Sequence, residues 1–302
     1  NKVVYSRCLI GVILIICMIF IVKANTKVQT NTTLEQLQNN GHSQMMGYII
    51  KTNNNKIIVI DGGTSDDTQN LVKKINEYTG KVDYWFITHP HKDHATCFID
   101  IVENYNIEIG KVYVTLNDED WYKKYGDGRD EECIKFLNTI KGDKIANKVE
   151  EVYLNEKIKI DNIDCEILGV KNPEITTNAI NNSSMVIQIQ VNQKKILFLG
   201  DTGTESSEKL IKNQGKNLKS DIVQVAHHGQ AGATEELYKI VNPKICLWPT
   251  IDWLWDNIAD GKKNAGPFKT METRQWMENL KVKQNYLAQD GIKSIKIFKL
   301  EN

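Results

Sequence analysis

Six consecutive residues carry four side chains that can bind a divalent metal ion. Residues 89–94 read His-Pro-His-Lys-Asp-His, so three of the six histidines in this 302-residue chain fall within one short stretch. Imidazole nitrogens and carboxylate oxygens are ligands that zinc, manganese and iron accept. Ligands on one helix face recur at every third or fourth residue, so this closer spacing predicts a tight turn. With His89 and His91 pointing to one side and Asp93 and His94 to another, such a turn could serve two adjacent metal ions.

Three further polar sites also follow stretches that are typical of buried strands. They are Asp61 after residues 56–60, Asp201 after residues 195–199, and His227-His228 after residues 222–226. Residues at the ends of strands along one sheet edge can converge, and active sites of layered α/β folds favour such edges. We therefore expect Asp201 to bridge two metal ions and one histidine of the pair to complete the site of Asp93 and His94. Asp61 is expected to orient the histidine turn through a hydrogen bond.

The rest of the chain alternates between predicted strands and predicted helices. Apolar residues at helical spacing predict helices at residues 68–78, 98–105, 131–141, 206–213, 234–241 and 270–281. Two pairs of strand-like runs, 45–51 with 56–60 and 185–191 with 195–199, flank short polar turns that are typical of hairpins. This alternation predicts an α/β layered fold. No linker-like composition follows residue 45, so we predict one folded domain over residues 45–302.

The N-terminal residues indicate targeting to, or through, a membrane. Lys2 and Arg7 precede fourteen consecutive apolar residues at 9–22. That length fits a signal-peptide core, about 7–15 residues, better than a full membrane span of about 20. Val22-Lys23-Ala24 offers a small-residue cleavage pattern, whereas the lysine beside the apolar run favours an uncleaved anchor, so residues 1–24 are either a signal peptide or a membrane anchor. Both alternatives place the rest of the chain outside the cytoplasm, secreted or anchored. Residues 25–44, rich in Asn, Thr and Gln, are predicted to be a linker.

Charge and cysteine content argue against some classes of protein. Lys+Arg and Asp+Glu both number 38, and a net charge of zero argues against nucleic acid as the main partner, although a local basic patch stays compatible with it. The six cysteines include no Cys-x-x-Cys pair, which excludes a zinc ribbon. The four outside the N-terminal segment, Cys97, Cys133, Cys165 and Cys246, are expected to be buried free thiols, with one or two disulfides as the alternative in a protein outside the cell. Composition predicts no oligomeric state.

The order of these motifs resembles that of the metallo-β-lactamase superfamily over residues 45–300. Residues 58–63, 88–94, 199–203 and 225–229 are similar to its first, second, fourth and fifth motifs. The resemblance implies a four-layer αββα sandwich with a metal centre at one sheet edge. The run Asn181-Asn182-Ser183-Ser184 before a strand, and Asp290-Gly291-Ile292 before the last strand, are similar to the branch that includes the hydrolase domain of ComEC-type DNA-uptake proteins.

One departure from the family pattern affects the expected metal centre. A third-motif histidine is absent between residues 94 and 201, and residues 181–184 occupy its place. The His89/His91 site therefore lacks a ligand, whereas Asp93, His94, Asp201 and a histidine still form a four-ligand site. We expect Zn²⁺ or Mn²⁺, one ion bound tightly and one weakly. Asn182 and Ser183 are expected beside the ligands without binding metal.

The two histidines of the fifth motif have different expected roles. The register of related motifs makes His228 the metal ligand and leaves His227 to contact phosphate or to donate a proton. Asp93 and His227 are the candidate catalytic residues. Trp248, Trp253 and Trp255 follow the next strand, where they either roof the pocket or pack in the core.

The resemblance favours a metal-dependent hydrolase that uses a metal-bound hydroxide. A phosphodiester or related phosphoryl compound is the expected substrate, either a small molecule or a surface-bound one. Two alternatives stay open. The missing histidine is compatible with a non-catalytic, membrane-tethered binding protein of the same fold, and a similar metal centre could hydrolyse a lactone or a thioester.

Overall fold

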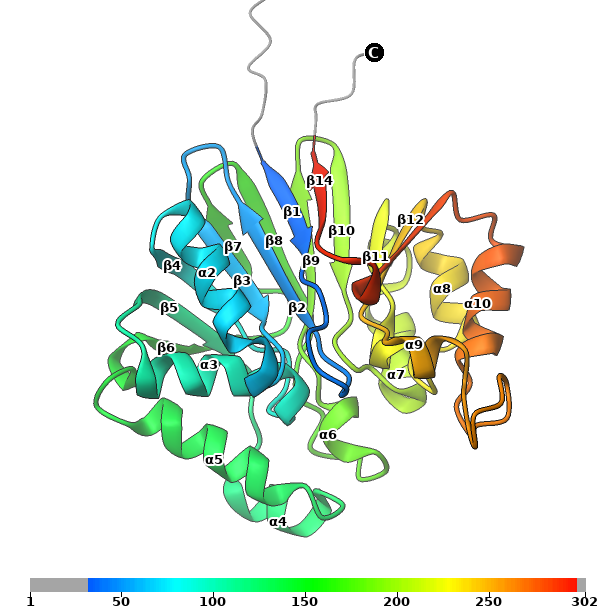
Figure 1. The fold of residues 1–302 in the computed structure, drawn as a ribbon, viewed down its shortest axis with the longest axis horizontal. Helices are drawn as coiled ribbons and strands as arrows, with labels where there is room; N and C mark the ends of the chain where they lie inside the picture. Colours follow the sequence, from blue (N-terminus) through cyan, green and yellow to red (C-terminus); the bar gives the residue numbers. More distant parts are fainter. Residues whose placement is uncertain (1–31, 298–302) are drawn as a thin grey trace, which may run out of the picture. The chain divides into compact units, whose positions relative to one another are not determined.

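Two seven-stranded β-sheets pack face to face, with helices on both outer faces (Figure 1). The computed structural model describes residues 32–297. The predicted four-layer αββα sandwich is confirmed. In spatial order the first sheet consists of β14 (Lys293–Lys296), β1 (Thr33–Gln36), β2 (Gly47–Lys51), β3 (Ile57–Asp61), β4 (Lys81–Phe86), β5 (Glu108–Val114) and β6 (Val149–Glu151). The second consists of β13 (Gln284–Leu287), β12 (Ile245–Trp248), β11 (Ile222–Gln224), β10 (Lys194–Phe198), β9 (Val186–Val191), β8 (Ile163–Gly169) and β7 (Lys157–Ile160).

The helices follow the strands in the alternating order that the sequence predicts. They are α2 (Thr68–Tyr78), α3 (Lys92–Asn104), α4 (Glu119–Tyr125), α5 (Asp130–Lys141), α6 (Ala179–Asn182), α7 (Thr204–Gln214), α8 (Glu235–Val241), α9 (Asp252–Trp255) and α10 (Thr270–Asn279). Short 3-10 turns complete the connections, and one of them, Ala226–Gly229, carries the two adjacent histidines.

Three hydrophobic clusters fill the three interfaces between the four layers. Strand β2 shows how side-chain alternation produces them, because Ile49 packs with residues of α2, α3 and α5 while the next residue, Ile50, packs with the second sheet. The third cluster joins the second sheet to α7, α8 and α10. Each large apolar side chain that is fully buried in these clusters contributes about 1.5–3 kcal/mol. The layers are therefore held by a core that is large enough to fix the sheet edges firmly.

The strand directions bring the polar motifs to one edge. Strands β3 to β6 are parallel in the first sheet, and β10 to β13 are parallel in the second. Segments that follow β3, β4, β10 and β11 therefore emerge at the carboxyl ends of their strands, where layered α/β folds place their sites. These segments contain Asp61 at the end of β3, the hexapeptide at residues 89–94, Asp201, and the adjacent histidines His227 and His228.

The structure corrects the predicted linker at residues 25–44. Residues 33–36 form β1, which pairs antiparallel with both β2 and β14, and Leu34 is fully buried. The polar composition of this stretch gives no clear strand pattern, because the strand is stabilised by pairing with β2 and β14. The folded domain therefore begins before residue 45. The prediction for residues 1–24 lies outside the described residues. Within residues 32–297, no helix is both long and apolar enough to cross a membrane. The four cysteines expected as buried free thiols are confirmed.

Candidate metal centre

The hexapeptide divides between a loop and a helix. His89 to His91 form an extended segment after β4, and α3 begins at Lys92, so that Asp93 and His94 lie in its first turn. The amide of His94 donates to the carbonyl of His91 at 3.0 Å, which closes that turn. This change of backbone direction separates the two pairs of side chains, as the spacing predicts, although the second pair lies on a helix that was expected to begin only at residue 98.

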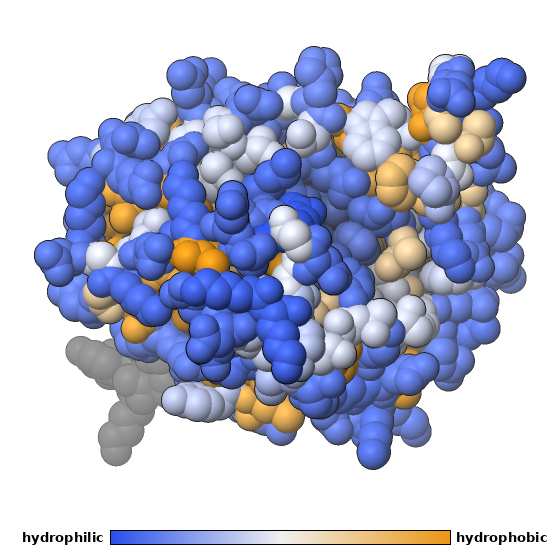
Figure 2. All heavy atoms as spheres, turned by 90° about the horizontal axis from the view of Figure 1, so that it is seen from below, coloured by the Kyte–Doolittle hydropathy of each residue, from blue (hydrophilic) through white to orange (hydrophobic). Residues whose placement is uncertain are grey.

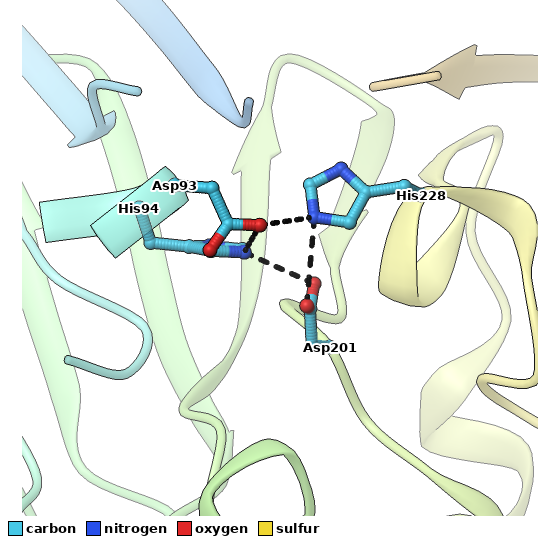
Figure 3. A group of neighbouring side chains, drawn as sticks. All are labelled: Asp93, His94, Asp201 and His228. Carbon is cyan, nitrogen blue, oxygen red and sulfur yellow. Dashed lines mark ion pairs between the residues drawn. The ribbon is translucent and has the colours of Figure 1, made fainter. Parts of the chain in front are cut away.

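Four buried side chains from three segments converge on one point (Figure 3). Nε2 of His94 lies 3.2 Å from Oδ1 of Asp201, and Nε2 of His228 lies 3.1 Å from Oδ2 of Asp93 and 3.5 Å from Oδ2 of Asp201. One ligand atom from each of the four residues can be chosen so that all lie within 4.8 Å of one another. Two imidazoles and two carboxylates at this separation form a donor set that suits a divalent metal ion.

Unpaired atoms in this cluster indicate that a cation belongs there. Among the described residues, His94 Nε2, His228 Nε2, Asp93 Oδ1 and Asp201 Oδ1 are buried and make no hydrogen bond of normal geometry, although His94 and His228 lie at ion-pair distance from the two carboxylates. Buried polar atoms are normally paired, and each unpaired one costs about 1–3 kcal/mol. A divalent ion bound by these four residues would satisfy their unpaired nitrogens and carboxylates together. The residues therefore fit a metal site better than a network of hydrogen bonds.

Hydrogen bonds on the outer side of both histidines aim Nε2 toward the centre. Nδ1 of His94 lies 2.8 Å from Oδ2 of Asp61, and Nδ1 of His228 lies 2.7 Å from the carbonyl oxygen of Pro249. The backbone amide and the hydroxyl of Thr88 both donate to Asp61 at 2.7 Å, which fixes that carboxylate in turn. Metal-binding histidines usually make such an outer hydrogen bond, which sets their tautomer and ring orientation. Asp61 is thus in the position that the sequence analysis expects.

Several residues around the cluster have left-handed backbone conformations. Asp61, His227 and His228 have φ of 55°, 50° and 53°, and Gly200 before Asp201 has φ of 56°. A Cβ on Gly200 would lie 2.9 Å from the Ser184 side chain, so only glycine fits there. The left-handed region costs a non-glycine residue on the order of 1–3 kcal/mol, and such strain concentrates at functional sites. Here it directs His228 into the cluster, Asp61 toward His94 Nδ1 and His227 toward the pocket wall.

We predict that Asp61→Asn weakens metal binding without emptying the site. Asparagine keeps the size of the side chain but loses the charge that orients His94, and replacing such a partner lowers metal affinity by about 10–100-fold. Competition against a chelator of known affinity measures the change. Asp67→Asn is the matched control, because Asp67 is a buried aspartate that caps the turn at residues 64–67 and lies outside both metal groups. Equal loss of affinity in both variants would contradict the orienting role.

A second group shares Asp201 with the first. His89, His91 and Asp201 also place ligand atoms within 4.8 Å, with Nε2 of His89 at 3.8 Å from Oδ2 of Asp201 and 3.1 Å from Nδ1 of His91. This group offers three side chains where the first offers four. The missing third-motif histidine predicts one site with four ligands and one with fewer. The donors are arranged in two such unequal groups. Ser184 Oγ lies 3.3 Å from His89 Nδ1, on the side of the ring away from Nε2.

Asn182 and Ser183 do not contact the cluster, and their expected role is corrected. Asn182 joins α6 to α7 through hydrogen bonds with Ser206 and Glu205, and the Ser183 hydroxyl accepts from the amide of Asn172. Their neighbours Asn181 and Ser184 face the site instead. Residues three apart lie on one side of a helical turn, which explains why the outer pair of this Asn-Asn-Ser-Ser run approaches the cluster and the inner pair does not.

The two groups differ in how strongly protons compete with a metal ion. Burial by itself would lower the pKa of His228, but Asp201 and Asp93 outweigh it and raise the pKa to about 9. Asp201 and Asp61 likewise overcome burial and hold the pKa of His94 well above its ordinary value. In the second group burial dominates, and it lowers the pKa of His91 to about 4. At neutral pH without metal, His228 is therefore protonated, whereas His91 is neutral.

Metal binding to the four-residue group is accordingly predicted to release protons. A metal ion binds neutral imidazole, so the proton on His228 must leave below about pH 9. Affinity should rise with pH from 6 toward 9, by about tenfold per pH unit for each proton released. Calorimetric titration in two buffers with different ionisation enthalpies counts those protons. The weaker group, whose histidines are already neutral, should release none, and pH-independent affinity at the tighter site would contradict the assignment.

The cluster lies in a pocket of about 500 Å³. This end of the molecule is hollowed and mostly hydrophilic around the opening (Figure 2). His91, Asp93 and Asp201 line the pocket together with Arg129, Asn181 and His227. The Arg129 guanidinium lies 3.6 Å from Asp93 and is held by Glu132, which also accepts from the backbone amide of Lys92. A cation is thus fixed beside the candidate metal ligands.

Arg129 and Asn181 are site residues that the sequence analysis missed. Only three arginines occur in the whole chain, so an arginine among 35 lysines was a signal that could have been followed. Asn181 Oδ1 is buried and has no hydrogen-bond partner in residues 32–297. This amide oxygen is available to a bound ion or to a substrate.

His227 lies at the pocket wall and outside both metal groups. Its Nε2 lies 3.2 Å from Asn181 Nδ2, and its Nδ1 lies 3.3 Å from the carbonyl oxygen of Ala231. A carbonyl can only accept, so this network puts the proton on Nδ1 and leaves Nε2 as an acceptor. Burial lowers the pKa of His227, which keeps the ring neutral at pH 7. This environment suits a proton acceptor better than the proton donor expected from the sequence.

Comparison with known protein families agrees with this fold and this site. The model of the metallo-beta-lactamase superfamily matches residues 44–245, about two thirds of the chain. The chain belongs to the metallo-β-lactamase superfamily. Members are generally metallohydrolases, and the His/Asp clusters described above support a divalent-metal-dependent hydrolase.

Individual relatives resemble parts of the chain. ComE operon protein 3 from Bacillus subtilis (strain 168) is 28% identical over 100 residues, which are 33% of this chain and 12% of that protein. Among solved structures, CmlA, a diiron β-hydroxylase from Streptomyces venezuelae, has a TM-score of 0.54 at 12% identity, covering 88% of this chain and 54% of that one. The metallo-β-lactamase fold protein YhfI from Bacillus subtilis has a TM-score of 0.49 at 11% identity, over 88% and 99%. At such identities the structural likeness concerns the fold alone.

Proposed function

We propose that this protein is a divalent-metal-dependent hydrolase of a phosphodiester or related phosphoryl substrate, from the ComEC-like branch of the superfamily. The observation that carries the proposal is the pair of His/Asp groups sharing Asp201 beside a fixed arginine in one pocket. When bound, a divalent ion supplies a nucleophile at neutral pH by lowering the pKa of water. The similarity to ComE operon protein 3 over 100 residues supports the branch.

The pocket residues suit an anionic substrate. The guanidinium of Arg129 presents five donors in a plane that matches the oxygens of a phosphoryl group. The Asn181 amide oxygen lies on the pocket wall and can accept from a substrate hydroxyl, while His227 Nε2 accepts from Asn181 Nδ2 and can take a proton once a bound substrate displaces that amide. Zn²⁺ and Mn²⁺ are the proposed ions, with the four-residue group binding more tightly.

Arg129→Gln is predicted to lower kcat/KM for a phosphodiester by about 10–100-fold. The lost interaction is a charge-assisted hydrogen bond, worth about 1.5–3 kcal/mol. Arg274→Gln is the control, because Arg274 packs over the Trp255 ring on the other helical layer and does not line the pocket. Steady-state kinetics on both variants at saturating Mn²⁺ measure the effect. Equal losses in the two variants would show that Arg129 acts only on stability.

A substrate-class comparison tests the function itself. The full chain is stripped of metal and then assayed with Zn²⁺ or Mn²⁺ on bis(4-nitrophenyl) phosphate, a γ-lactone and a thioester. The proposal expects metal-dependent turnover of the phosphodiester above the two carbonyl substrates. Metal bound without hydrolysis of any phosphodiester would refute it. Turnover of the lactone or thioester alone would select the carbonyl alternative, and less than one metal per chain would favour the binding-protein alternative.

A further inference from the structure

The pocket has another wall that contributes no candidate metal ligand. It is built from Gln44 in the loop between β1 and β2, Gln230 in the loop after the adjacent histidines, and Trp253 on α9. Helix α9 follows β12 of the second sheet, whereas Arg129 precedes α5, which packs over the first sheet. The pocket therefore has a cationic side from one half of the sandwich and an aromatic and amide side from the other.

The two glutamines present a hydrogen-bond donor and an acceptor side by side. Gln230 Nε2 donates to Gln44 Oε1 at 3.0 Å. This leaves Gln44 Nε2 and Gln230 Oε1 without a hydrogen-bond partner within the described part of the chain. If both amides are turned over, the pair forms in reverse and again leaves one donor and one acceptor. The polarity of this wall thus does not depend on how the amides are assigned.

Trp253 adds a fixed aromatic surface to that wall. Its indole Nε1 donates to the carbonyl of His42 at 3.2 Å, and its ring packs against Phe268 with 5.6 Å between centroids. The side chain is half-buried and lines the pocket. Of the three tryptophans that the sequence analysis considered, Trp248 is fully buried and Trp255 packs against it, so only Trp253 lines the pocket. An indole that is fixed by these contacts and lines the pocket can stack against a planar group.

The wall is attached to the candidate metal cluster through the backbone. Gln230 lies two residues after His228, and Gln44 lies two residues before Met46, whose amide donates to the carbonyl of Asp93 at 3.0 Å. A group that contacts these glutamines therefore lies close to the cluster. A volume of about 500 Å³ is within the range of small-ligand sites, about 300–1,000 Å³.

We propose that Trp253 and the Gln44–Gln230 pair form a subsite for a planar ring that carries an adjacent donor and acceptor, as a nucleobase does. The scissile phosphoryl group of the same substrate would lie beside Arg129. The inference rests on the proposed function, because it assigns the part of the phosphodiester that does not react. It identifies the substrate as a nucleoside phosphodiester by the chemistry of the wall.

Binding of two ligands that share a deoxyribose 5-phosphate, one with a base and one with a hydroxyl in its place, tests the subsite. The full chain is titrated calorimetrically with thymidine 5′-monophosphate and with 2-deoxyribose 5-phosphate, once with Mn²⁺ and once with EDTA. We expect the nucleotide to bind about tenfold more tightly, equivalent to about 1.4 kcal/mol and within the range for one stacked base. Trp253→Leu should bring the two affinities together. Trp276→Leu, which removes a half-buried tryptophan outside the pocket, should keep them apart.

The outcomes separate this inference from the proposed function. Equal affinities in the unaltered protein, or an unchanged ratio in Trp253→Leu, would overturn the subsite. Hydrolysis of bis(4-nitrophenyl) phosphate without any preference for the nucleotide would refute the subsite and leave the proposed function standing. A preference that depends on Trp253, without hydrolysis of any phosphodiester, would support the subsite and refute the function.

Discussion

Asp201→Asn is expected to remove metal from both groups at once. Asp201 is the residue that the two groups share, and its carboxylate approaches His94, His228 and His89 within 3.8 Å. Asparagine keeps the shape of the side chain and the hydrogen bond from the backbone amide of residue 201 to Ser184 Oγ, but it removes the negative charge. We expect metal content below one ion per chain and a loss of phosphodiester hydrolysis of about 10³-fold or more, since several kcal/mol of transition-state stabilisation disappear.

Thermal unfolding gives a second measurement that does not depend on activity. A metal at 100 times its Kd stabilises the folded state by about 2.7 kcal/mol, which raises Tm by roughly 4–5 °C for a chain of this size. This metal-dependent rise should be absent in Asp201→Asn. Asp221→Asn is the matched control, because Asp221 lies at the opposite end of β11, where it contacts Lys194 and the amide of Lys195. The control should keep its full metal content and its rise in Tm.

Single-group variants make the prediction sharper. Asp93→Asn alters only the four-residue group, and His91→Asn alters only the three-residue group. We expect the first to lose the tightly bound ion and the second to lose the weaker one, each keeping the other. Full retention of two ions by Asp201→Asn would show that the carboxylate does not bridge the groups.

Elements with a strong local pattern were predictable from the sequence. Leu71, Val72 and Ile75 recur at helical spacing before Gly80, and α2 has the bounds that this pattern predicts. Strand β1 and helix α9 have no comparable pattern, because β1 is stabilised by pairing with β2 and β14 and α9 is a single turn. Helix α4 was not predicted, although Asp118 is a residue type typical of a helix N-cap. Its side chain accepts from the amide of Trp121 in that role.

The candidate site was predictable where a strand end places a residue. Asp61 ends β3 and Asp201 lies three residues after β10, and parallel strand order brings such positions to one edge. Arg129 lies in the turn before α5 and Asn181 lies on the short helix α6, and the position of both segments depends on packing between layers. The carbonyl of Pro249, which fixes His228, is a backbone atom and leaves no signal in the residue types. Sequence therefore indicated the candidate ligands and Asp61, but not the other residues that surround them.

The two adjacent histidines are predicted to give opposite metal contents when each is replaced. His228 Nε2 points into the four-residue group, and its Nδ1 is fixed by Pro249, whereas His227 belongs to neither group. His228→Asn should therefore lose the tightly bound ion, and with it nearly all hydrolysis. His227→Asn should keep both ions and still lose about 10²–10⁴-fold in kcat, the usual contribution of a proton-transferring side chain.

Metal analysis and kcat measured on the same preparations separate these roles. Both residues have the same backbone conformation, with φ near 50°, and asparagine tolerates that conformation, so the two substitutions impose similar backbone demands. His227→Asn therefore serves as the matched control for His228→Asn in metal binding. Loss of metal in His227→Asn with retention in His228→Asn would reverse the assignment. Loss in both would show that the pair acts as one structural unit, and that the wall residue His227 supports the metal site through the strained turn at residues 226–229.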